Sequence, residues 1–157
     1  MLSHLIAELM QKQVEQIIQQ VVYWAVSQES VLAVALVGSQ ARGTATAESD
    51  IDLMFLARQP LRFRTSADWL KEIGWGDRHI ESWEDKDYGA VWSRHVQLNT
   101  STLSRVAVEL SFGQSSWASI APLDAGTQRV VRDGCRILYD PREYLSPLVQ
   151  LVLNQHR

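Results

Sequence analysis

Hydrophobic residues recur at steps of three and four positions over the first part of the chain. The recurring positions include Leu2, Ile6, Leu9, Ile17 and Val21, with glutamine, lysine and glutamate between them. This spacing places the apolar side chains on one face of a helix and the polar side chains on the other. It predicts one long amphipathic helix within residues 1–28, which the polar segment "SQES" ends.

Two apolar segments come next, "VLAVALV" (31–37) and "DIDLMFLA" (50–57). Apart from the two aspartates of the second segment, neither alternates with polar residues, which is typical of strands buried on both faces. We therefore predict two β-strands. The segment "ARGTATAE" (41–48) between them is predicted to hold a short helix.

The middle of the chain mixes polar and apolar residues. "SADWLKEIG" (66–74) is predicted as a helix with Ser66 as its N-cap. "DRHIESW" (77–83) is predicted as a short strand, and the acidic "EDKDYG" (84–89) as a solvated loop.

Alternation is clear in "VWSRHVQL" (91–98) and "LSRVAVELSF" (103–112). The polar "NTST" separates the two segments, so they are predicted to form an antiparallel hairpin.

The last part of the chain begins with "SSWASI" (115–120), which predicts a helical turn. Residues 126–140 are predicted as a second hairpin, because Asp133-Gly134 stands between two apolar alternations. A C-terminal helix is predicted within 141–157, where Pro147 either kinks the helix or marks its start. The order of elements predicts an α/β (α+β) fold with helices flanking a mixed sheet, and residues 1–157 as a single domain.

Composition narrows the class of protein. The chain has 157 residues, enough for one domain with a sizeable core, and its net charge of −3 disfavours a long nucleic acid as a partner. The one cysteine, Cys135, fits a reducing compartment. The N-terminus lacks the basic region of a signal peptide, and "SQES" interrupts the apolar residues 21–37. We therefore expect no membrane span and a cytoplasmic location.

The chemistry concentrates around the second apolar strand. Asp50 and Asp52 are one residue apart, so their side chains project to the same side of an extended chain. Two adjacent carboxylates repel each other unless a hard cation bridges them, and Mg²⁺ prefers such oxygen ligands and shares them with phosphates. Gly38 and Ser39 follow the neighbouring strand and offer backbone N–H groups and a hydroxyl to an anion. Together these residues predict a site for a nucleoside triphosphate with its magnesium.

Two further residues are candidates for this site. Arg42 either contacts phosphate or braces the loop against Glu48, and both roles stay open. Glu109 is the lone acid on one face of "RVAVELSFG", on a strand that can pair beside the two aspartates. Alone it would be interpreted as a solvated strand residue, but beside the upstream acids we predict it as a third ligand for two metal ions.

The segment "GSQARGTATAESDIDL" resembles the signature of the DNA polymerase β-like nucleotidyltransferase superfamily, namely Gly-Ser, a ten-residue gap and Asp-x-Asp. The inner "ARG" and "SDIDL" match its common bacterial form. "VELSFG" and "PLDAGTQRVVRDGCRILYDP" look similar to small bacterial members related to aminoglycoside adenylyltransferases.

The resemblance implies a nucleotidyltransferase fold like the polymerase β palm, with a catalytic core in residues 31–112. It implies that Gly38 and Ser39 hold the β- and γ-phosphates of ATP or another nucleoside triphosphate, and that Asp50, Asp52 and Glu109 bind two magnesium ions. A hydroxyl of the acceptor would attack the α-phosphorus and pyrophosphate would leave. Glu109, with its place nearest the attacking hydroxyl, is also a candidate for accepting the proton.

The acceptor stays open. Small hydroxyl compounds such as aminoglycosides are candidates, and a second subunit is a candidate for completing the site, since the N-terminal helix offers apolar surface. One alternative is a minimal antitoxin-type nucleotidyltransferase that binds and adenylylates a small helical partner protein. Another is a nucleotide-binding module without catalysis, which the intact Asp50 and Asp52 disfavour.

Overall fold

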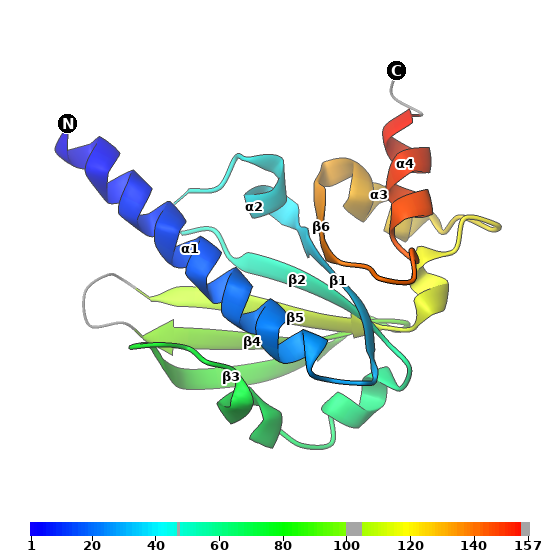
Figure 1. Cartoon of the computed structure of the whole chain (residues 1–157), viewed down its shortest axis with the longest axis horizontal. Coiled ribbons are helices and arrows are strands. Elements are labelled where there is room, and N and C mark those ends of the chain that lie inside the picture. Colours follow the sequence, from blue (N-terminus) through cyan, green and yellow to red (C-terminus); the bar gives the residue numbers. More distant parts are fainter. Residues whose placement is uncertain (47, 100–104, 155–157) are drawn as a thin grey trace.

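A mixed six-stranded β-sheet forms the centre of the computed structural model, which describes residues 1–46, 48–99 and 105–154 (Figure 1). The spatial order of the strands is β3-β4-β5-β2-β1-β6. Their bounds are β1 Val31–Val37, β2 Ile51–Ala57, β3 His79–Asp87, β4 Trp92–Asn99, β5 Val106–Gly113 and β6 Cys135–Tyr139. The helices are α1 Leu2–Val26, α2 Gly38–Arg42, α3 Ala125–Asp133 and α4 Ser146–Asn154, with short 3₁₀ helices η1 Pro60–Phe63, η2 Asp68–Glu72 and η3 Ser115–Ala118. The α+β fold class with a mixed sheet is confirmed.

Strand direction changes at the middle of the sheet. β1 pairs antiparallel with both β2 and β6, whereas β2 pairs parallel with β5. On the other side of β5, the strands β4 and β3 continue antiparallel, so the predicted hairpin of β4 and β5 is confirmed. Residues 103 and 104, with which the second predicted strand begins, lie outside the described residues.

Helix α1 covers one face of the sheet with its C-terminal half. Ile17, Val21 and Trp24 are buried there in the same core cluster as Leu53 and Phe55 of β2. The N-terminal half of α1 projects beyond the sheet (Figure 1). Its apolar side chains are exposed, with 73% of Leu2, 52% of Leu5 and 57% of Leu9 accessible to solvent. The predicted N-terminal helix is confirmed, but its apolar stripe is longer than the sheet it packs on.

The opposite face is covered over only part of its width. A second core cluster joins β1 and β2 to η3, α3 and α4, with Ala35, Met54, Val131 and Leu148 among its buried members. The corresponding positions of β4 and β5 are polar, as in the pair Ser93 and Ser111, whose hydroxyls lie 2.6 Å apart. The sheet therefore leaves a polar surface beside the helix-covered part of this face.

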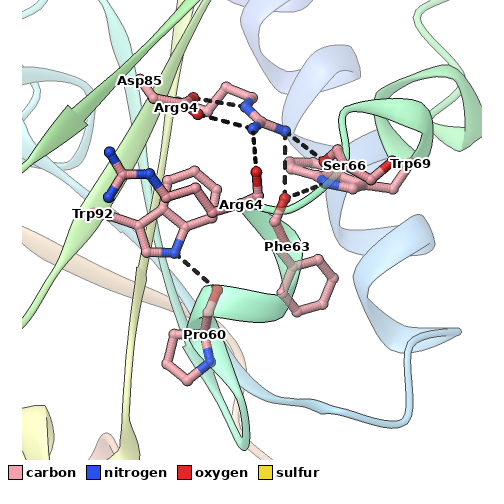
Figure 2. Close-up of polar contacts among 8 residues, drawn as sticks. All are labelled: Pro60, Phe63, Arg64, Ser66, Trp69, Asp85, Trp92 and Arg94. Carbon is pink, nitrogen blue, oxygen red and sulfur yellow. Dashed lines mark hydrogen bonds and ion pairs between the residues drawn. The ribbon is translucent and has the colours of Figure 1, made fainter.

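A buried arginine, Arg94 of β4, joins β3 to the η1–η2 connection on the α1-covered face of the sheet (Figure 2). Only 1% of the Arg94 side chain is exposed, and its Nε and Nη2 donate to the carboxylate of Asp85 at 2.7 and 2.9 Å. Its remaining N–H groups meet the carbonyls of Phe63, Arg64 and Ser66 at 3.0–3.4 Å. All five donors of the guanidinium therefore have partners, which is what a buried charge needs.

The second hairpin, predicted at residues 126–140, is wrong. Helix α3 occupies Ala125–Asp133, and β6 then pairs with β1. The helix forms because Oδ2 of Asp124 accepts a hydrogen bond from the Thr127 N–H at 2.9 Å, and because Thr127 and Val131, four residues apart, are buried. Gly134, with φ of +142°, ends the helix, so Asp133-Gly134 is a helix end and not a hairpin turn.

Two further predictions need correction. The acidic loop predicted at 84–89 is largely strand, because β3 continues to Asp87 as an edge strand whose outward charges are solvated. The helix predicted at 66–74 is a five-residue 3₁₀ helix that begins at Asp68, although the Ser66 hydroxyl does accept the Asp68 N–H at 3.1 Å.

The short helix predicted within 41–48 lies earlier, at Gly38–Arg42, directly at the strand end. The predicted helical turn at 115–120 and the C-terminal helix are confirmed as η3 and α4, and Pro147 is the second residue of α4. Among the described residues, no helix combines the length and the apolar character needed to cross a membrane.

Candidate active site

The turn between β1 and α2 contains the first two predicted site residues. Gly38 has a left-handed φ of +75°, and a Cβ atom there would collide with Oδ2 of Asp52. Glycine is therefore required both by the backbone and by the close approach of the carboxylate. Ser39 follows in a half-buried position, and its hydroxyl has no protein partner within the described part of the chain. The turn thus has a hydroxyl without a described partner one residue after the glycine that adjoins the Asp52 carboxylate.

Arg42 braces this turn, but not in the way the sequence suggests. Its Nη1 donates to the Asp133 carbonyl at 2.9 Å and its Nε to the Thr44 hydroxyl at 3.0 Å, so the brace is to the end of α3 and not to Glu48. Gly134 lies so close that a Cβ would stand 3.0 Å from the carbonyl oxygen of Gly38. The α3–β6 corner therefore supports the turn from behind.

The three predicted acids come together. In the parallel pairing of β2 with β5, Asp52 lies directly beside Glu109, and Asp50 precedes Asp52 on the same side. One carboxylate oxygen from each residue lies within 4.8 Å of the others. The predicted pairing of the Glu109 strand beside the two aspartates is confirmed.

The electrostatics of this cluster are unfavourable without a cation. Burial, followed by the neighbouring charges of Glu109 and Asp50, raises the pKa of Asp52 to about 7. Oδ1 of Asp52 is buried and has no hydrogen-bond partner among the described residues. An orphaned, desolvated oxygen between two other carboxylates fits a hard divalent cation, whose charge would compensate all three.

His95 is a site residue that the sequence alone did not indicate. Its Nε2 lies 3.2 Å from Oδ2 of Asp50, and in the β4–β5 pairing it stands directly opposite Glu109. The alternation of β4 places it on the polar face, with Ser93 and Gln97. That pattern gives the face but not the register, and only the register brings the imidazole to the acids.

The family model described as nucleotidyltransferase domain matches residues 15–98, more than half of the chain. The chain belongs to this nucleotidyltransferase domain family. The match contains Gly38, Ser39, Asp50 and Asp52 and ends before Glu109. No curated protein matches the chain at a significant level.

Next to the acids of this nucleotidyltransferase domain is a cavity of about 1000 Å³. It lies between the N-terminal half of α1, the segment that leads into β2, and the adjoining ends of β4 and β5. Ile6 and Met10 form part of its apolar wall, and Asp50 lines it at the end nearest the acidic cluster. The cavity therefore gives solvent and small molecules room beside one carboxylate of the cluster.

Proposed function

We propose that this chain is a magnesium-dependent nucleotidyltransferase that moves a nucleoside monophosphate, AMP from ATP, to an acceptor hydroxyl and releases pyrophosphate. The observation that carries the proposal is the orphaned Oδ1 of Asp52 among Asp50 and Glu109, next to the Gly38 turn, in a chain of this family. A buried carboxylate cluster of this kind is costly to the fold unless it serves a cation.

The residues take complementary parts in this reaction. Asp50, Asp52 and Glu109 would hold magnesium, which neutralises charge on the α-phosphate when it is bound. Backbone N–H groups at Gly38 and the Ser39 hydroxyl would bind the β- and γ-phosphates, and Arg42 would add positive charge at the same edge. These groups orient the triphosphate and stabilise the charge that develops, which is most of the catalysis in phosphoryl transfer.

The chemical step follows from that placement. The acceptor oxygen forms a bond to the α-phosphorus while the bond from this phosphorus to the bridging oxygen of the pyrophosphate breaks. The acceptor hydroxyl loses its proton, for which Glu109 is our candidate acceptor. Pyrophosphate leaves on the side of Ser39, and the acceptor enters from the opposite side of the α-phosphorus, as an in-line displacement requires.

An acceptor screen tests the proposal. The purified chain is mixed with ATP, Mg²⁺ and pooled hydroxyl compounds, and pyrophosphate release is followed together with transfer of label from the α-phosphate. Asp52→Asn should lower transfer by roughly 10³-fold, in the range seen when a single electrostatic stabiliser is removed. Asp77→Asn, at an exposed position outside the site, is the matched control and should leave the rate unchanged. Transfer that survives Asp52→Asn would contradict the proposed mechanism.

A protein acceptor is the second candidate, and the exposed apolar stripe at the start of α1 favours it. Leu2, Leu5 and Leu9 expose more than half of their surface. Ile6 and Met10 of the same helix line the cavity that Asp50 also lines. A second copy of the chain or a small helical partner that covered this stripe would stand next to the acids. Mass measurement in solution and capture from the native host, followed by a test for an adenylyl group on the captured protein, distinguish these occupants from a small-molecule acceptor.

A further inference from the structure

Strand pairing restrains the backbones of the three acids of the candidate site to different degrees. Asp52 lies within β2, between the backbone partners Val37 and Glu109, so strand pairing on both sides fixes its position. Glu109 is likewise inside β5, paired with β2 and β4. Asp50 precedes the first residue of β2, and the described residues 48–50 belong to no helix or strand, so no ladder holds its backbone.

Open space in front of Asp50 adds to this freedom. Its carboxylate lines the cavity of about 1000 Å³, and 42% of its side chain is accessible to solvent. Packing therefore does not select one rotamer, and an unrestrained carboxylate loses conformational freedom when it binds a metal ion.

The contact that restrains Asp50 comes from β4. Nε2 of His95 lies 3.2 Å from Oδ2 of Asp50, and within the described part of the chain this is the hydrogen-bonding partner of the Asp50 side chain. An ionised carboxylate only accepts hydrogen bonds, so Nε2 is the donor. The backbone of His95 is itself fixed, because β4 pairs on both sides, with Glu84 opposite His95 on β3 and Glu109 opposite it on β5.

We propose that His95 is a positioning residue, which holds one oxygen of Asp50 so that its other oxygen faces the Asp52–Glu109 pair as a metal ligand. The inference rests on the proposed function, since it concerns the same metal site. Hydrogen bonds from an outer residue to a ligating carboxylate orient the ligand, and their loss typically lowers metal affinity by 10–100-fold. His95 acts through Asp50 and need not touch the nucleotide.

The test titrates Mn²⁺, as the probe metal, into the full chain without nucleotide and follows free Mn²⁺ by electron paramagnetic resonance. His95→Ala should weaken binding by about 10–100-fold. His95→Gln, which keeps an N–H donor at similar reach, should bind almost as tightly as the wild type. His95→Asn has the same amide on a shorter side chain and should bind weakly. His79→Ala, at an exposed histidine at the start of β3, is the matched control and should change nothing.

A double-mutant cycle separates positioning from general damage to the site. In an Asp50→Asn background, the additional His95→Ala change should cost no further affinity, because His95 acts through the Asp50 carboxylate. Circular dichroism of each variant checks the fold, and if His95→Ala does not fold, the comparison of His95→Gln with His95→Asn decides.

The contrary results are distinct. Wild-type affinity in His95→Ala or His95→Asn, or an equal loss in the presence and absence of the Asp50 carboxylate, would overturn the positioning role alone. A wild-type chain that binds no Mn²⁺ would overturn the proposed function and this inference with it.

Discussion

Arg94 and Asp52 are ionisable residues on opposite faces of one sheet, and they differ in how their polar atoms are paired. Arg94 is almost fully buried, yet each of its N–H groups has a carboxylate or carbonyl partner (Figure 2). Asp52 has a buried oxygen with no partner among the described residues, and its neighbours Glu109 and Asp50 carry the same charge. The partners of the first cluster all lie within the chain, whereas under the proposed function a cation from outside would complete the second.

The two clusters are separated by a single step along β4. Arg94 and His95 are adjacent, and because side chains alternate along a strand, one enters the arginine cluster and the other reaches the acids. Three tryptophan rings, those of Trp69, Trp83 and Trp92, lie 4.4–5.3 Å from the guanidinium carbon of Arg94. The aromatic side of the strand thus lies directly behind the side that faces the acids, and changes to the two sides should have different consequences for stability and for metal binding.

The largest effect is expected from Arg94→Met. Removing the guanidinium takes the side-chain donor from the Asp85 carboxylate and from the Arg64 and Ser66 carbonyls, whereas the Phe63 carbonyl keeps the Trp69 indole N–H. The loss should lower the free energy of unfolding by about 3–5 kcal/mol. Urea denaturation measures this. Arg94→Met combined with Asp85→Leu removes both charges and should recover part of the loss. If Arg94→Met were as stable as the wild type, the comparison would be contradicted, because the arginine cluster would then contribute nothing to the free energy of unfolding.

Metal binding should stabilise the folded protein, and this gain should depend on the acidic cluster. Mg²⁺ at 100 times its dissociation constant is expected to raise the free energy of unfolding of the wild type by about 2.7 kcal/mol. Thermal denaturation at pH 8, with Mg²⁺ and with a chelator, measures the difference. Asp52→Asn should lose this gain and Asp77→Asn should keep it. An equal gain in Asp52→Asn would place the ion somewhere else.

Gly38→Ala should harm the site and the fold together. The left-handed backbone at Gly38 strains any other residue by about 1–3 kcal/mol, and the added Cβ would push the Asp52 carboxylate from its place. Both Mn²⁺ affinity and the midpoint of urea denaturation should fall. Gly89→Ala is a suitable control, because its φ is also positive, at +82°, but a Cβ there meets no atom within 4 Å. Gly89→Ala should therefore lower stability alone and leave Mn²⁺ affinity unchanged.

The smallest effect is a dependence of stability on pH. The pKa of Asp52 is about 7 in the folded chain, against 3.8 ordinarily. Between these values the unfolded chain releases a proton that the folded chain retains, so without metal the free energy of unfolding should fall as pH rises from about 4 to about 7. We expect a change of order 1 kcal/mol, since solvent reaches part of the carboxylate. Urea denaturation at several pH values with a chelator should show a flatter profile for Asp52→Asn, and identical profiles would contradict the raised pKa.

How far the sequence predicts the molecule depends on how local each feature is. Gly38, Ser39, Asp50 and Asp52 lie in one short segment between two apolar strands, so spacing alone was enough to place them together. Glu109 is predictable because alternation along its strand gives the face of its side chain, and the two upstream aspartates indicate a metal site that a third acid would complete. His95 was missed because its role depends on the register between β4 and β5, which no local pattern specifies.

Turn residues were the least reliable guide. Asp133-Gly134 is a common hairpin turn, but glycine after an amphipathic segment is equally typical of a helix end. The deciding interaction is the capping of α3 by Asp124, whose carboxylate accepts the Thr127 N–H. The arginine cluster was likewise beyond local patterns, since it joins β3 and β4 to the η1–η2 connection.

The support of the β1–α2 turn has a consequence for how freely this sequence can vary. Gly38 has the Asp52 carboxylate in front of it, and Gly134 lies directly behind its carbonyl. In a saturation-mutagenesis library, we therefore expect positions 38 and 134 to be intolerant together, although they are far apart in the chain. The corner between α3 and β6 would then restrict which substitutions the candidate nucleotide site tolerates, although the corner itself need not contact the nucleotide.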